Sequence, residues 1–138
     1  MSRGSDGSRN PFWSDTGGMS GTGRTVLVVD DQDLVRDVIR LTLERAGYTV
    51  LAAASPNAAL DLARGGGRGS IDLLVTDVVM PEMDAFELAD RIACEVPGVR
   101  ILYTSGYTDA AAEGPFIQKP FTPAQLVEKV SDVLATSF

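Results

Sequence analysis

The chain contains no histidine and only one cysteine, Cys94, among its 138 residues. Without histidine it lacks the commonest metal ligand and the commonest general base, so zinc chemistry and Ser-His catalysis are not expected. A single cysteine cannot form an intramolecular disulfide, which is typical of proteins in a reducing compartment.

Long apolar runs and an excess of positive charge are also missing. No apolar run approaches the roughly 20 residues that span a bilayer, and the N-terminus has no apolar centre like that of a signal peptide. Acidic residues outnumber basic ones by 19 to 12, giving a formal net charge of −7. This charge argues against binding to nucleic acids or anionic membranes, so we expect a soluble, cytoplasmic protein that contacts neither.

The length fits a single domain with a real hydrophobic core. Residues 1–24 are rich in glycine and serine, and Phe12 and Trp13 are their only aromatic side chains. Such a composition does not offset the entropy of ordering, so we predict a flexible tail or linker over residues 1–24 and one domain over residues 25–138. The aromatic pair is either a docking motif or packs locally.

Five short apolar runs alternate with segments of helical spacing, which predicts an α/β fold. The runs cover residues 26–30, 49–53, 71–77, 99–105 and 116–119. This alternation predicts a five-stranded parallel sheet with right-handed crossovers and with helices on both faces. In such sheets, ligands bind at the carboxyl ends of the strands, near the change in strand order.

The helical segments carry recognisable start signals and apolar faces. Ser55 precedes Pro56 in a small Ala/Leu helix, Asp84 forms a capping-box pair with Glu87, and Thr122 forms one with Gln125. Three expected buried faces follow from the helical period: Leu34, Val35, Val38, Ile39, Thr42 and Ala46; Phe86, Ala89, Ile92, Ala93 and Val96; and Leu126, Val127, Val130, Val133 and Leu134.

Charged residues stand at the carboxyl ends of three runs. Asp30 and Asp31 close the first, Asp77 closes the third, and Lys119, one of only two lysines, closes the last. Clustered carboxylates bind hard divalent cations, and a lysine ammonium is a compact partner for phosphate oxygens. The four residues therefore predict one pocket that suits a divalent cation and a phosphoryl group.

The motifs VLVVDD, VTDVVMPEMD, YTSGY and QKPF follow one another at these predicted strand ends. In this order they resemble the motifs of response-regulator receiver domains of two-component signalling, over residues 25–135. The segments ILYTSGY and FIQKPFTPAQL resemble receivers attached to hybrid histidine kinases. The resemblance implies a flavodoxin-like strand order 2-1-3-4-5.

The resemblance also implies roles for the acidic residues. Asp77 would accept a phosphoryl group from a histidine kinase or a histidine phosphotransfer protein. Mg²⁺, or Mn²⁺, would be bound directly by Asp31, by Asp77 and by the backbone carbonyl of Val79, whereas Asp30 would act through water or by shaping the local electric field. Without a cation, repulsion among the carboxylates should raise the pKa of at least one of them.

Lys119 and three further residues also match the family pattern. Lys119 would follow the phosphoryl oxygens, and Pro120 would position that lysine through a cis peptide bond. Ser105 matches the hydroxyl that turns toward the phosphoryl group, and Phe116 matches the aromatic side chain that then moves inward. We expect the last two to form the switch.

The chain departs from the family pattern at two places. Ala85 replaces a usual glycine, which either restricts a left-handed backbone or simply continues the helix from Asp84. The stretch GYTDAAAEGP, residues 106–115, is shorter than the usual strand-helix-strand connection, so the helix before the last strand should be truncated or absent. Only residues 108–113 could be helical. In the family, this helix forms the face for dimerisation or output contacts together with the last strand and the last helix, so such contacts are in doubt here.

Val79 and Tyr107 occupy positions that tune hydrolysis of the acyl phosphate in the family. An apolar valine and a bulky tyrosine would limit the access of water, so we predict slow self-dephosphorylation. Catalysis beyond the domain's own phosphotransfer and dephosphorylation is not expected.

Several alternatives stay open. The domain could be a stand-alone regulator or the receiver of a hybrid kinase, and its output partner and oligomeric state are not predicted. It could be a pseudo-receiver that binds partners without phosphorylation, as Ala85 and the short connection suggest. It could also be a haloacid-dehalogenase-like phosphohydrolase, because Asp31 and Asp33 mimic that nucleophile signature, although the chain is short for that class.

Overall fold

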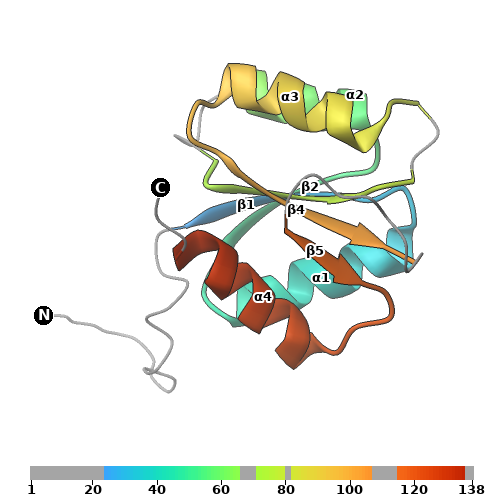
Figure 1. Ribbon diagram of the computed structural model, residues 1–138, viewed down its shortest axis with the longest axis vertical. Helices are drawn as coiled ribbons and strands as arrows, with labels where there is room; N and C mark the ends of the chain where they lie inside the picture. Colours follow the sequence, from blue (N-terminus) through green and yellow to red (C-terminus); the bar gives the residue numbers. More distant parts are fainter. Residues whose placement is uncertain (1–23, 66–70, 80–81, 107–114, 136–138) are drawn as a thin grey trace, which may run out of the picture.

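The structure, a computed structural model, describes residues 24–65, 71–79, 82–106 and 115–135. These residues form five strands and four helices around one sheet (Figure 1). In chain order the elements are β1 (Thr25–Val29), α1 (Asp33–Arg45), β2 (Thr49–Ala53), α2 (Pro56–Gly65), β3 (Leu73–Asp77), α3 (Ala85–Glu95), β4 (Arg100–Ser105), β5 (Phe116–Gln118) and α4 (Pro123–Ala135).

All strand pairs in the sheet are parallel, and the strand order is β2-β1-β3-β4-β5. The expected fold class and strand order are therefore confirmed. Strands β1 and β3 are neighbours in this order although a whole strand-helix unit separates them in sequence. Their carboxyl ends, which carry the acidic residues, consequently lie side by side.

Helices cover both faces of the sheet, with α2 and α3 on one face and α1 and α4 on the other (Figure 1). Strand β1 shows why, because its alternate side chains enter different cores. Leu27 and Val29 pack with α2 and α3, whereas Val26 and Val28 pack with α1 and α4. A strand that is buried on both faces reads as a continuous apolar run, which explains the sequence VLVV.

The expected buried face of α1 was partly wrong. Leu34 and Val38 are exposed by 80% and 53%, whereas Ile39 and Leu43 are buried at 1% and 0%. The helix therefore turns an adjacent stripe toward the sheet, and it leaves two large apolar side chains on its surface. Spacing alone does not distinguish two neighbouring apolar stripes on one helix.

The faces of the later helices were closer to expectation. In α4 the expected residues Leu126, Val130, Val133 and Leu134 are buried. In α3, Ala93 is exposed, and Leu88, which was not expected on the buried face, is fully buried.

The capping box expected at the start of α4 is present, whereas the expected Asp84–Glu87 pair takes another form, because the Glu87 carboxylate pairs with Arg91 at 2.6 Å. The Thr122 N–H donates to Gln125 Oε1 at 2.9 Å, and the Gln125 N–H donates to Thr122 Oγ1 at 3.1 Å, which is a reciprocal capping box. Asp84 caps α3 by accepting a hydrogen bond from the Phe86 N–H at 2.6 Å. Ala85 is the first residue of that helix, so it continues the helix from Asp84.

The connection between β4 and β5 is short, as expected. None of the four helices in the described residues lies between these strands. Gly106 and Pro115 are its described ends, and the expected helical residues 108–113 lie outside the described part of the chain. The same holds for residues 1–23 of the expected tail, including Phe12 and Trp13.

The helices of the domain are too short or too polar to cross a membrane, in so far as the structure describes them.

Helix α1 allows a matched test of the packing. We expect Leu43→Ala to lower the free energy of unfolding by about 2–5 kcal/mol, because it leaves a cavity in the core. Leu34→Ala on the same helix should change it by no more than about 0.5 kcal/mol, because that side chain is largely in water. Urea unfolding of both variants measures the difference, and equal losses would contradict the observed face of the helix.

Candidate functional site

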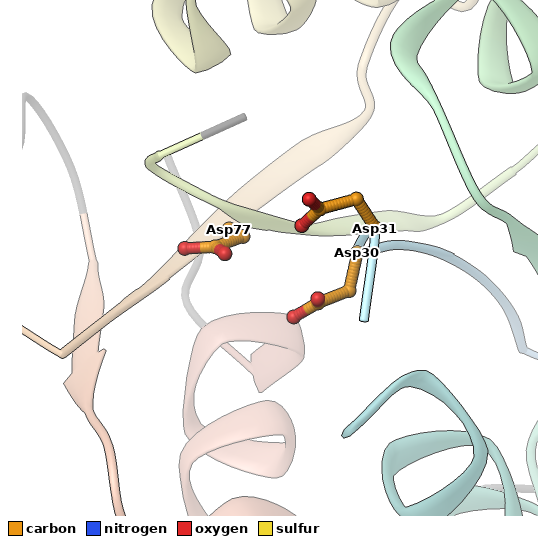
Figure 2. A group of neighbouring side chains, drawn as sticks. All are labelled: Asp30, Asp31 and Asp77. Carbon is orange, nitrogen blue, oxygen red and sulfur yellow. The ribbon is translucent and has the colours of Figure 1, made fainter. Parts of the chain in front are cut away.

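Three aspartates meet at the carboxyl edge of the sheet. Asp77 is the last residue of β3, and Asp30 and Asp31 directly follow β1, which pairs with β3. One carboxylate oxygen of each lies within 4.8 Å of those of the other two. Figure 2 shows the carboxylates of Asp30 and Asp31 directed toward the side on which Asp77 lies.

Lys119, which follows the edge strand β5, adds a positive charge to this cluster. Its Nζ lies 3.1 Å from Asp30 Oδ2 and 3.4 Å from Asp77 Oδ2. Its backbone N–H donates to the carbonyl oxygen of Ser105 at 2.7 Å, which ties the residue to the end of β4. The Lys119–Pro120 peptide bond is cis, as expected.

Backbone donors orient two of the carboxylates. The Gln32 N–H donates to Asp30 Oδ1 at 2.9 Å, and the Val79 N–H donates to Asp77 Oδ1 at 3.2 Å. Asp30 is 1% exposed and Asp77 is 8% exposed, whereas Asp31 is open to solvent. The cluster therefore has a buried floor and one accessible carboxylate.

Arg36 is a neighbour that the sequence analysis missed. Its Nη1 donates to the carbonyl oxygen of Asp30 at 2.9 Å, and its Nη2 lies 2.6 Å from Asp33 Oδ1. The spacing of three residues between Asp33 and Arg36 is the signal that could have indicated this ion pair. Arg36 thus braces the turn that presents Asp30 and Asp31.

The two expected switch residues lie on neighbouring strands beside the cluster. Ser105, the last residue of β4, is 1% exposed. Phe116, the first residue of β5, is half-buried and packs against the core under α2 and α3. Its register partner Tyr103 lies with its ring centroid 4.9 Å from that of Phe86, so Phe116 borders an aromatic pair.

The two expected hydrolysis-tuning residues are described unequally. Val79 is 55% exposed beside Asp77, and Tyr107 lies outside the described residues.

Comparison with known proteins identifies the family of the chain. A family model described as the response regulator receiver domain matches residues 26–131. The chain belongs to this family. The receiver occupies most of the sequence, and the resemblance seen in its motifs is confirmed.

Relatives of this receiver occur as parts of long proteins and as short ones. It is 38% identical over 118 residues to the sensor kinase CckA of Brucella abortus, covering 80% of this chain but 12% of that protein. It is 35% identical over 122 residues to a chemotaxis protein CheY homologue of Campylobacter jejuni, covering 80% of this chain and 92% of the homologue.

Solved structures agree with the fold. The crystal structure of the receiver domain from the hybrid histidine kinase CckA superposes with a TM-score of 0.71 at 34% identity, covering 80% of this chain and 98% of that one. A Vibrio cholerae chemotaxis protein, CheY4, gives a TM-score of 0.70 at 28% identity, with 80% and 98% covered.

The acidic cluster of the receiver fits a divalent cation. Oxygen ligands about 2.1 Å from a magnesium ion lie about 3 Å apart when adjacent and about 4 Å apart when opposite. The three carboxylate oxygens lie within 4.8 Å of one another, which is close enough for them to face one such ion together. Three carboxylates and the Lys119 ammonium leave two formal negative charges, which one divalent cation balances.

Burial raises the pKa of the Asp77 carboxyl above its ordinary value of 3.8, because the ionised form loses hydration. The Lys119 ammonium and the Val79 N–H act in the opposite direction, and the negative charge of Asp30 raises this pKa further. The expected rise in a carboxylate pKa is therefore confirmed. Its main cause is burial, with repulsion between carboxylates as a smaller contribution.

The raised pKa of Asp77 predicts a pH-dependent effect of Asp77→Asn. Ionised Asp77 weakens the folded state near pH 7, whereas well below its ordinary value of 3.8 the carboxyl is protonated in both states. Without divalent cations, we expect Asp77→Asn to raise the thermal unfolding midpoint near pH 7, and the gain to vanish below about pH 4. Asp90→Asn, at an exposed site on α3, controls for the loss of one carboxylate. A gain that grows toward acidic pH would contradict the assignment.

Proposed function

We propose that this receiver is a phosphorylation-dependent signalling switch in which Asp77 accepts a phosphoryl group from a histidine kinase or a histidine phosphotransfer protein. The observation that carries the proposal is the Asp77 carboxylate at 3.4 Å from the Lys119 ammonium, beside Asp30 and Asp31 at the open edge of the sheet. Family membership supports the same role.

In the proposed step, an oxygen of the ionised Asp77 carboxylate attacks the phosphorus of a phosphohistidine. The new O–P bond forms as the N–P bond breaks, and the imidazole nitrogen that leaves takes up a proton. The Val79 N–H holds one carboxylate oxygen, so the carboxylate keeps one orientation. The Lys119 ammonium lies where it can stabilise the negative charge of the transferred oxygens.

We propose that Asp30, Asp31 and Asp77, with the backbone carbonyl of Val79, hold Mg²⁺ or Mn²⁺ for this step. When bound, the cation neutralises phosphoryl charge and removes the repulsion between carboxylates. The convergence of the three carboxylate oxygens supports this assignment. Asp31, the accessible member, is positioned to admit the cation from solvent.

The proposed readout passes from the pocket to the edge of the sheet. Ser105 would turn its hydroxyl toward the phosphoryl group, and Phe116 would move inward. Burial of Ser105 next to the Lys119 backbone supports the first role, and the half-buried position of Phe116 beside the aromatic pair supports the second. The proposal includes one domain over residues 25–138 and a cytoplasmic location.

Two alternatives have less support. A dehalogenase-like phosphohydrolase needs Asp33 beside Asp31 in its site, but Asp33 lies at the start of α1, is 82% exposed and pairs with Arg36. A pseudo-receiver was suggested by Ala85 and by the short connection between β4 and β5, and of these two features Ala85 is accommodated as the first residue of α3. The grouped acids and Lys119 favour a phosphorylated receiver over both.

Acetyl phosphate with Mg²⁺ provides a direct test. We expect the wild-type protein to form a stable phosphoprotein, and we expect Asp77→Asn or chelation of the metal to abolish it. Lys119→Met should slow the reaction by at least about tenfold, because it removes the only ammonium at the pocket in the described chain. Lys129→Met on α4 is the matched control. Multiple turnover without a phosphoprotein would indicate a phosphohydrolase, and no reaction would indicate a pseudo-receiver.

A second test concerns the lifetime of the phosphoryl group. The exposed Val79 lies beside Asp77 and presents no polar group from its side chain, so we propose that it disfavours an attacking water. Val79→Asn should accelerate loss of the acyl phosphate several-fold, as followed by a time course after removal of the donor. Rapid loss in the wild type that this substitution leaves unchanged would contradict the proposal.

A further inference from the structure

Thr104 on β4 carries a buried hydroxyl that has no hydrogen-bond partner in the described part of the chain. The residue is 1% exposed, and its Oγ1 finds no partner among the described residues. Thr76 on β3 is equally buried, but its hydroxyl donates to the Asp77 carbonyl at 3.1 Å. A buried hydroxyl without a partner has lost its hydration without compensation, and a valine would fill the same volume without that cost.

Thr104 lies on the same face of the sheet as Asp77 and Lys119. It is the register partner of Asp77 on one side and of Ile117 on the other. Register partners in parallel strands project to the same face, and Lys119 follows Ile117 by two residues. The core contacts agree, because Leu102, Val75 and Ile117 all pack with α1 and α4.

The Lys119 side chain must cross β4 to reach its partners. Strands β3 and β5 are separated by β4, so their backbones lie about 10 Å apart. Lys119 Nζ nevertheless lies 3.4 Å from Asp77 on β3 and 3.1 Å from Asp30 beyond it. Lys119 stands two residues beyond Ile117, one register partner of Thr104, and its ammonium reaches Asp77, the other register partner, so we infer that its side chain crosses β4 near Thr104.

A divalent cation in the acidic cluster would repel the Lys119 ammonium from Asp30. This repulsion favours a retreat of the ammonium toward its own backbone and therefore to a place above β4.

We propose that the Thr104 hydroxyl is a positioning group for Lys119, which accepts a hydrogen bond from the ammonium once a divalent cation occupies the acidic cluster. The inference rests on the proposed function, because it presupposes cation binding there. It explains why a hydroxyl stands at a buried position that suits valine. The hydroxyl is costly in the cation-free state and useful in the loaded state.

Thermal unfolding with and without Mg²⁺ tests this role. In EDTA, Thr104→Val should raise the midpoint by roughly 3–6 °C, because it removes an uncompensated hydroxyl. The same variant should need about 2- to 10-fold more Mg²⁺ for half of the maximal stabilisation, because the loaded state loses a hydrogen bond. Thr104→Ser should keep the wild-type Mg²⁺ dependence. Thr76→Val, which removes a paired hydroxyl, should lower the midpoint in EDTA.

Lys119→Met shows whether the hydroxyl acts through the lysine. In the Lys119→Met background, Thr104→Val should leave the Mg²⁺ dependence unchanged. In the Lys129→Met background, Thr104→Val should shift the Mg²⁺ dependence as it does in the otherwise wild-type protein. If Mg²⁺ stabilises the wild-type protein and Thr104→Val has the same Mg²⁺ dependence, the role of Thr104 is overturned and the cation site is not. A wild-type protein that Mg²⁺ does not stabilise would overturn the cation site and this role together. A lower midpoint of Thr104→Val in EDTA would show that the hydroxyl is already paired.

Discussion

The ion pairs of Lys119 with Asp30 and Asp77 are the interaction on which the rest of the site depends. The three residues come from the ends of β5, β1 and β3, and they meet only because β3 lies between β1 and β4 in the sheet. The parallel arrangement brings all strand ends to one edge, and the two buried cores hold the strands in register. The site is therefore a property of the strand order.

The same interaction sets the energetic character of the pocket. Burial disfavours the ionised form of Asp77, and the nearby charge of Asp30 adds to that cost. The Lys119 ammonium and the Val79 N–H offset part of it without removing it. In the proposed function, a divalent cation would relieve this remaining imbalance, and a phosphoryl group would change the local charge again.

Much of this was predictable from the sequence. Asp30, Asp31, Asp77 and Lys119 each follow an apolar run, and parallel strands bring such ends together, so the cluster followed from the pattern. The exposed stripe of α1 was not predictable in this way, because Leu34 and Val38 are apolar like the buried Leu43. Only the packing of the helix against the sheet decides which of these side chains is buried. The contacts of Arg36 and the unpaired Thr104 hydroxyl depend on side-chain geometry, which residue spacing does not encode.

Strands β4 and β5 link the pocket to the edge of the sheet. The Lys119 N–H bonds to the Ser105 carbonyl, and Phe116 pairs in register with Tyr103, so a movement of the lysine or of Ser105 bears directly on the edge strand. The described chain has no helix between β4 and β5. This edge of the sheet therefore differs from that of a fold in which a helix connects every pair of successive strands. The readout in this receiver is therefore expected to depend on β5 and α4.

The proposed function rests on phosphorylation of Asp77. Borohydride reduction of the phosphoprotein, followed by peptide mass spectrometry, identifies the modified residue, because the reagent converts an acyl phosphate to an alcohol at the modified side chain. We expect homoserine at position 77 and unmodified aspartate at positions 30 and 31. Reduction at either of those positions, with Asp77 intact, would overturn the assignment of Asp77.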